Sequence, residues 1–337
     1  MPASPLSCPL ARREFLLSTA LGAGALATSL PAFSQALPST RVRMTMVVSP
    51  KEPLGVAMEF VVREAEKRSG GAVKIDFFPS GQLGQDLATF EQLSAGTVNV
   101  HASGFGINAN YNSFFAPWLF NDFAHVERVL ESPLAQQWNA DLVKTRGVSV
   151  LMAYPRAPRQ MTNSKRAIRT PDDLKGLKLR VPEIPILFNA FKGLGAEPVA
   201  MNFGEVYTAL QSGTIEGQEN PLPTIVGFSL QEVQKFVSLT EHVRAPEFIY
   251  VNARWWTGLD PRVRELLSTL FAEGKKIAAQ AIVEQQQTNL AAIRKANAAI
   301  NEVDQAAFRT RARPVLDRIG PQFLGADTYA AIVRAAT

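Results

Sequence analysis

The sequence predicts an α/β protein with two similar lobes, each a sheet flanked by helices, and a long helix that braces both. Expected strands and helices alternate in two separate stretches of the chain, and a largely helical stretch follows the second one. The length of 337 residues also suits two domains of ordinary size.

The first alternating stretch lies between residues 42 and 102. Its apolar patterns predict strands over 42–48, 73–78 and 97–102, separated by helices over 53–71 and 85–96. Glycines 70, 71 and 96 mark the helix ends. Such alternation predicts parallel strands joined by right-handed crossovers.

The second stretch repeats this pattern. It predicts strands over 177–182, 197–201 and 214–220 and helices over 185–195 and 203–213. Asn202 and Glu205 are spaced as an N-cap and its capping-box partner. The segments "LSAGTVNV" (93–100) and "LQSGTIEG" (210–217) resemble each other, which supports two similar lobes.

The remaining chain is expected to link these lobes. Residues 246–256 have the pattern of one more strand, and residues 261–301 that of a long helix bracing both lobes. A pair of surface helices in one domain is the alternative. We expect lobe 1 to comprise residues 37–157 plus about 246–285, and lobe 2 residues 158–245 plus about 286–337.

The N-terminus has the features of an export signal. Arg12 and Arg13 precede a weakly apolar run at 16–30, and Ala36 ends a small-residue cleavage pattern. We predict a twin-arginine signal peptide, residues 1–36, and a periplasmic product. The run is too short and too weakly apolar to span a membrane, and no other stretch is expected to do so. The single cysteine, Cys8, lies inside the signal.

Two function classes have little support. The formal charge is +5, but the basic residues are scattered, so we expect no nucleic-acid partner. The three histidines, His101, His125 and His242, do not have metal-ligand spacing, and motifs for a nucleophile elbow, a phosphate loop or a catalytic cysteine are missing. We therefore predict no catalytic residues, no metal and no cofactor. The carboxylates Glu216 and Glu219 do not by themselves define an acid–base site.

The second stretch brings three polar or aromatic residues to one sheet edge. Arg180, Phe203 and Asn220 each lie at or just past the carboxyl end of an expected strand, where open α/β sheets bind ligands. An arginine fork suits a carboxylate, so we expect a pocket for a small organic anion. A surface arginine and a turn asparagine are the alternatives.

Three segments carry a resemblance to a known family. They are "FPSGQLGQDLATFEQLSAGTVNV" (78–100), "NSKRAIRTPDDLKGLKLRVPE" (163–183) and "FGEVYTALQSGTIEGQENP" (203–221). They resemble the solute-binding proteins of tripartite ATP-independent periplasmic (TRAP) transporters, the DctP-like dicarboxylate-binding family. The resemblance implies a two-lobed periplasmic solute-binding fold with a ligand cleft between the lobes. It also implies capture of a small carboxylate and delivery to TRAP permease subunits driven by an ion gradient.

The resemblance also implies roles for single residues. Arg180 would clamp the ligand carboxylate, with Arg159 as the second cation, Asn220 as an amide donor and Phe203 as a stacking wall. Arg156 competes with Arg159 for the second role, because "AYPRAPRQ" (153–160) departs from the family pattern. Further residues expected at the ligand are Gln82, Asp86, Ser103, Gly104 and, in the cleft wall, Trp118.

Two other functions stay open at this point. The same fold could serve a periplasmic sensor that acts on a receptor, or the chain could be an exported hydrolase. The sequence also leaves open whether the ligand is a dicarboxylate, a sugar acid, a keto acid or an aromatic acid, and what the oligomeric state is.

Overall fold

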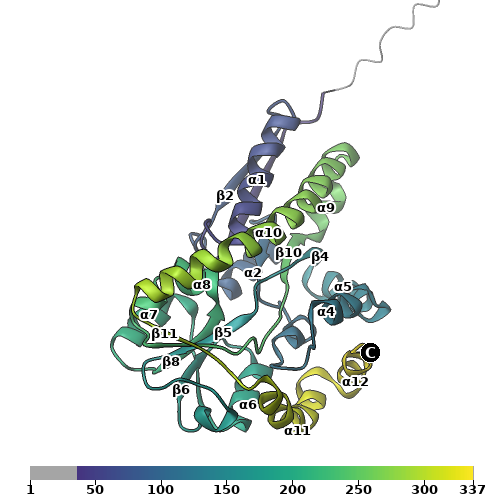
Figure 1. Cartoon of the computed structure of the whole chain (residues 1–337). Coiled ribbons are helices and arrows are strands. Elements are labelled where there is room, and N and C mark those ends of the chain that lie inside the picture. Colours follow the sequence, from purple (N-terminus) through teal and green to yellow (C-terminus); the bar gives the residue numbers. More distant parts are fainter. Residues whose placement is uncertain (1–35, 337) are drawn as a thin grey trace, which may run out of the picture. The chain divides into compact units, whose positions relative to one another are not determined.

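Two β-sheets flanked by helices organise the chain (Figure 1). The computed structural model describes residues 36–336, so the predicted twin-arginine signal lies outside the described residues except for Ala36. From Leu37 onward the chain forms one compact unit. We call the first sheet with its helices lobe 1 and the second sheet with its helices lobe 2.

The sheet of lobe 1 has the strand order β2-β1-β3-β10-β4. Its strands are β1 (Thr40–Met46), β2 (Val73–Phe78), β3 (Val100–Ser103), β4 (Val148–Tyr154) and β10 (Glu247–Asn252). The sheet of lobe 2 has the order β11-β9-β5-β8-β6-β7. Its strands are β5 (Arg159–Asn163), β6 (Lys178–Val181), β7 (Glu197–Ala200), β8 (Gly217–Pro221), β9 (Phe236–Leu239) and β11 (Ala299–Glu302).

Helices connect these strands. The α-helices are α1 (Pro53–Arg68), α2 (Asp86–Ala95), α3 (Ala109–Asn112), α4 (Phe123–Glu131), α5 (Pro133–Arg146), α6 (Pro185–Gly193), α7 (Val206–Gln211), α8 (Leu222–Gly227), α9 (Ala253–Gly258), α10 (Pro261–Lys295), α11 (Gln305–Leu324) and α12 (Ala326–Arg334). Short 3₁₀ helices are η1 (Ser113–Phe115), η2 (Pro171–Leu174), η3 (Phe203–Glu205) and η4 (Leu230–Glu232).

The strands of each alternating stretch are parallel, as predicted: β1 pairs with β2 and β3, and β6 with β7 and β8. Two strands outside these stretches run antiparallel to their neighbours. β10 runs antiparallel to both of its neighbours in the first sheet, and β5 does so in the second. Each of these strands follows a segment of chain that crosses from the other lobe. It therefore enters its sheet without the helical crossover that makes neighbouring strands parallel.

The predicted brace is a single continuous helix. α10 is 35 residues long and contacts α1 and β4 of lobe 1 as well as α8 and β11 of lobe 2 (Figure 1). The alternative of a surface helix pair in one domain is thereby excluded for residues 261–295. Because α10 packs on both lobes, it couples their positions.

The structure confirms some of the helix and strand ends predicted from the sequence and corrects others. Gly96 and Gly213 adopt left-handed conformations, with φ of 80° and 74°, just past helices α2 and α7, as their repeated context predicts. The capping box at Asn202 is wrong, because its side chain makes no capping hydrogen bond. The strand expected over 246–256 ends at Asn252, whose side chain accepts from the Trp255 backbone N–H and begins α9.

No helix within residues 36–336 is long and apolar enough to cross a membrane. The predicted lobe boundaries stay a prediction, although each strand of the first sheet falls within the ranges expected for lobe 1.

Candidate ligand-binding site

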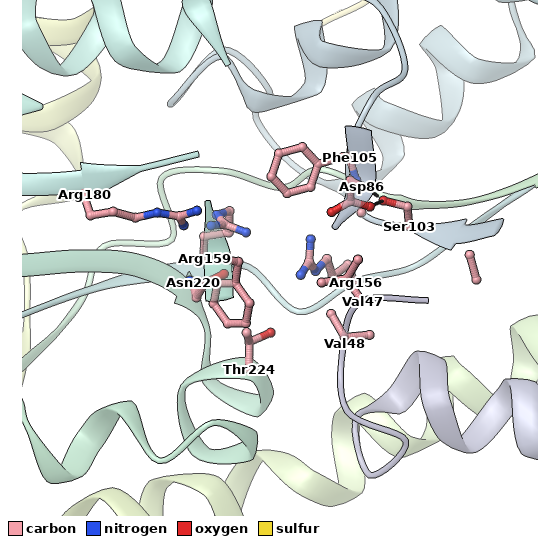
Figure 2. A pocket seen from close by; sticks show the side chains of 13 residues that line it. Val47, Val48, Asp86, Ser103, Phe105, Arg156, Arg159, Arg180, Asn220 and Thr224 are labelled. Atoms are coloured by element: carbon pink, nitrogen blue, oxygen red, sulfur yellow. Dashed lines mark hydrogen bonds between the residues drawn. The ribbon is translucent and has the colours of Figure 1, made fainter. Parts of the chain in front are cut away.

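A cavity of about 440 Å³, including its opening to solvent, lies between residues of the two lobes (Figure 2). Its lining from lobe 1 and the first crossover segment comprises Val47, Val48, Asp86, Ala102, Ser103, Gly104, Phe105 and Arg156. Its lining from lobe 2 comprises Arg159, Arg180, Phe203, Asn220 and Thr224. Strand ends of both sheets therefore meet at one small space, as the strand-edge rule predicts.

The structure brings most of the predicted residues together and leaves two apart. The seven that line the cavity are Arg180, Arg159, Asn220, Phe203, Asp86, Ser103 and Gly104. Gln82 is exposed and does not line it. Trp118 is also outside: its ring stacks on Phe308 of α11, with centroids 4.7 Å apart, and it lines a different cavity beside α11.

Several residues that line the cavity were not predicted from the sequence. Val47 and Val48 follow β1, and Phe105 follows β3, so the strand-end rule applied to lobe 1 would have found them. Thr224 lies in α8 and carried no signal of its own in the sequence.

Arg180 is a buried cation that faces the cavity without a carboxylate partner. It is 2% exposed, and its Nε and Nη2 donate to the Met201 carbonyl at 2.9 and 2.5 Å. No carboxylate of residues 36–336 forms an ion pair with it. Its Cζ lies 5.8 Å from the centre of the Phe203 ring. Burial lowers the pKa of Arg180 to about 10, against the opposing charge of Glu219.

Arg159 is instead held by a buried carboxylate. Its Nε and Nη2 donate to the two oxygens of Glu219, the second at 2.8 Å. The Glu219 carboxylate also accepts from Nε2–H of His242 at 3.0 Å, and His242 Nδ1 accepts from the Thr240 hydroxyl at 2.8 Å. Burial favours the neutral acid, but Arg159 and His242 together lower the pKa of Glu219 to about 2. Burial also lowers the pKa of His242, consistent with a neutral imidazole that donates from Nε2.

Arg156 forms a second buried ionic group. Its Nε lies 3.2 Å from Oε1 of Glu247, and the two side chains are 8% and 5% exposed. Burial raises the pKa of Glu247 to about 7; Arg156 opposes this shift and the nearby Glu52 adds to it. Burial likewise raises the pKa of Glu52. The Thr224 hydroxyl donates to Glu52 Oε2 at 2.6 Å, which joins α8 of lobe 2 to the residue preceding α1 of lobe 1.

Asp86 provides an acidic group on the lobe 1 wall. Its Oδ1 accepts from the Ser103 hydroxyl at 2.5 Å and lies 3.0 Å from His101 Nε2. Figure 2 shows the guanidinium groups of Arg180, Arg159 and Arg156 directed into the space that Asp86 faces. The cavity thus has several fixed donors and one carboxylate acceptor. Among residues 36–336, no group of three or more metal-binding side chains is placed to hold a metal ion.

This fold and this cavity define a class: a two-lobed binding protein for a small anionic solute. The chain belongs to the bacterial extracellular solute-binding proteins of family 7, whose profile matches residues 44–322. It is therefore a solute-binding protein of the TRAP type. The family and the two-lobed α/β fold predicted from the sequence are both confirmed.

Individual similar proteins agree with this assignment. The chain is 34% identical over 289 residues to a solute-binding protein of Verminephrobacter eiseniae, covering 84% of this chain and 86% of the other. It is 33% identical over 248 residues to the 2,3-diketo-L-gulonate-binding periplasmic protein of Escherichia coli, covering 72% and 75%. A TRAP periplasmic solute-binding protein from Bordetella bronchispeptica, crystallised with density assigned as pantoate, matches with a TM-score of 0.79 and 30% identity, covering 88% and 99%.

Proposed function

We propose that the protein captures a small carboxylic acid between its lobes and delivers it to a TRAP membrane permease driven by an ion gradient, without catalysing a reaction. The observation that carries this proposal is Arg180, a buried guanidinium that lines the cavity and has no carboxylate partner within residues 36–336. A ligand carboxylate would supply the missing countercharge through charge-assisted hydrogen bonds. The relatives named for 2,3-diketo-L-gulonate and pantoate, both carboxylic acids, support the same class of ligand.

The other lining residues have distinct proposed roles. Asn220 and Arg159 donate to the ligand, and Phe203 covers it with an apolar face. Asp86, Ser103 and Gly104 contact it from lobe 1. Ligand binding shifts the population toward the closed form, by no more than its preference for that form. We also propose export to the periplasm by the twin-arginine route, with cleavage after Ala36.

A thermal-shift screen of residues 37–337 against carboxylic acids tests the proposal. An acid at a hundredfold its dissociation constant stabilises the folded state by about 2.7 kcal/mol. This corresponds to a rise in Tm of roughly 4 °C for a chain of this length, at an unfolding entropy of about 2.1 cal/mol/K per residue. Arg180→Gln should abolish the rise for every acid, because the ligand loses its main cationic partner.

Arg166→Gln is the matched control. Arg166 also donates to backbone carbonyls through Nε and Nη2, those of Asp173 and Lys175, but it does not line the cavity. It should leave the acid-dependent rise unchanged. A folded protein that responds to no acid, or an Arg180→Gln variant that responds as the wild type does, contradicts the proposal.

A further inference from the structure

Arg156 has a buried donor without a hydrogen-bond partner among residues 36–336. Its side chain is 8% exposed and its Nε pairs with Glu247, but Nη1 is buried and has no hydrogen-bond partner. Buried guanidinium nitrogens without an acceptor are costly, so they are rarely left so in a folded protein. Because Arg156 lines the cavity, an acceptor atom of a bound ligand is the natural partner for Nη1.

The position of this guanidinium is set by a glycine. A Cβ atom added to Gly104 would lie 1.9 Å from Nη1 and 2.8 Å from Cζ of Arg156. Only a residue without a side chain lets the guanidinium lie against the backbone that follows β3. Gly104 and Arg156 are therefore packed as one part of the cavity wall.

Asp86 presents an acceptor on the same side of the cavity as Arg156 (Figure 2). Its Oδ1 is used by Ser103 and His101, whereas no group within residues 36–336 donates to its Oδ2. The two side chains do not form an ion pair, and Figure 2 shows the Arg156 guanidinium directed toward the side of the cavity that holds Asp86. A donor without a partner and an acceptor without a partner thus belong to two residues that line the same cavity.

We propose that Arg156 and Asp86 together recognise a hydroxyl group of the ligand, so that the protein selects hydroxylated monocarboxylic acids over diacids and over acids without hydroxyls. This inference rests on the proposed function, in which Arg180 holds the carboxylate. A hydroxyl accepts from Nη1 of Arg156 and donates to Asp86, which satisfies both groups at once.

Other ligand groups satisfy only part of this pair. A second carboxylate at the same place accepts from Arg156 but is repelled by the Asp86 carboxylate. A ketone oxygen accepts from Arg156 and leaves Asp86 without a donor. An apolar group leaves both groups unpaired, at the full cost of their lost hydration.

Calorimetric titration with two matched series of ligands tests the inference. The four-carbon series is D-erythronate, butyrate and succinate, and the six-carbon series is D-galactonate, hexanoate and adipate. In at least one series, the wild type should bind the hydroxylated acid roughly 10- to 100-fold more tightly than it binds the other two members. This comparison needs no variant, so it does not depend on any substitution folding.

Substitutions then assign the preference to the two residues. Arg156→Met and Asp86→Asn should each weaken binding of the hydroxylated acid by roughly 10- to 100-fold, and weaken binding of butyrate or hexanoate much less. The double variant should lose less than the product of the two single losses, because both residues hold the same hydroxyl. Arg166→Gln is again the matched control outside the cavity.

The outcomes separate the two proposals. If succinate or adipate binds as tightly as the hydroxylated acid, or if Arg156→Met weakens all members of a series equally, the hydroxyl inference is overturned while acid binding stands. If no acid of either series binds, or binding does not depend on Arg180, the proposed function fails and the inference fails with it.

Discussion

The guanidinium of Arg159 and the carboxylate of Glu219 form a two-point ion pair that is almost completely buried, with side-chain exposures of 3% and 0%. The pair joins β5 to β8, which are neighbouring antiparallel strands of the second sheet. It also distinguishes the two arginines of the cavity: Arg159 is largely neutralised by Glu219, whereas Arg180 has no carboxylate partner within residues 36–336.

Glu219→Gln should therefore destabilise the protein strongly. The substitution leaves the Arg159 charge buried without a partner, and breaking a buried pair costs about 3–5 kcal/mol. Urea unfolding of the variant and the wild type measures the difference in free energy of unfolding. Asp76→Asn is the matched control, because the Arg41–Asp76 pair is largely exposed, at 78% and 31%. The control should change stability by less than about 1 kcal/mol, and an equal loss in both variants contradicts the argument.

Because of the Glu219 carboxylate, the protein should lose stability in acid. The pKa of Glu219 is lowered from 4.5 to about 2 in the folded protein, so its contribution is complete above pH 4.5 and is lost as the pH falls toward 2. The free energy of unfolding should decline over this range, measured by urea titration at a series of pH values. Glu219→Gln should decline less steeply over the same range. If the free energy of unfolding of the variant falls with pH as steeply as that of the wild type, groups other than Glu219 cause the loss of stability in acid.

Glu247 should give the opposite dependence of stability on pH, in a higher pH range. Its pKa is raised from 4.5 to about 7, so its contribution is complete below pH 4.5 and is lost as the pH rises through 7. Glu247→Gln should flatten the decline in Tm between pH 5 and pH 8, whatever constant offset the substitution adds. The comparison of slopes, rather than of absolute Tm values, is the measurement. A variant whose Tm falls as steeply as that of the wild type contradicts the prediction.

Gly104→Ala should reproduce the ligand preference of an Arg156 variant. The added Cβ would lie 1.9 Å from Arg156 Nη1, so the guanidinium must leave its position against the backbone. We expect roughly 10-fold weaker binding of the hydroxylated acid, with butyrate unaffected, by calorimetry. Gly258→Ala is the control, since a Cβ added there would have no other part of the protein within 4 Å, apart from the adjacent residues and the nearby backbone of its own helix. Unchanged binding in Gly104→Ala would show that the close packing is not required.

Trp118→Phe should separate stability from binding. Trp118 is 6% exposed and stacks on Phe308, but it does not line the cavity between the lobes. The smaller ring should cost about 1–3 kcal/mol of stability and change acid affinity by less than about twofold. Phe203→Ala, which removes a lining residue, should weaken binding instead. A large loss of affinity in Trp118→Phe would show that Trp118 contributes to ligand binding.

The class of the protein and one wall of its site could be predicted from the sequence alone. Strand ends are readable from alternating patterns, and the carboxyl ends of parallel strands must meet at one edge, so Arg180, Phe203 and Asn220 could be placed together without coordinates. The order of strands and helices likewise fixed two α/β lobes, and the length of the helical pattern indicated α10.

The pairing of the buried charges could not be predicted from the sequence. Nothing in the local pattern shows that Glu219 neutralises Arg159, that Glu247 holds Arg156, or that Trp118 stacks on α11, since each contact joins residues far apart in the chain. The direction of β5 and β10 escaped the sequence for the same reason, because it depends on where the chain crosses between lobes. Periodicity reports which face of an element is buried, whereas the partner of a buried charge is chosen by packing in three dimensions.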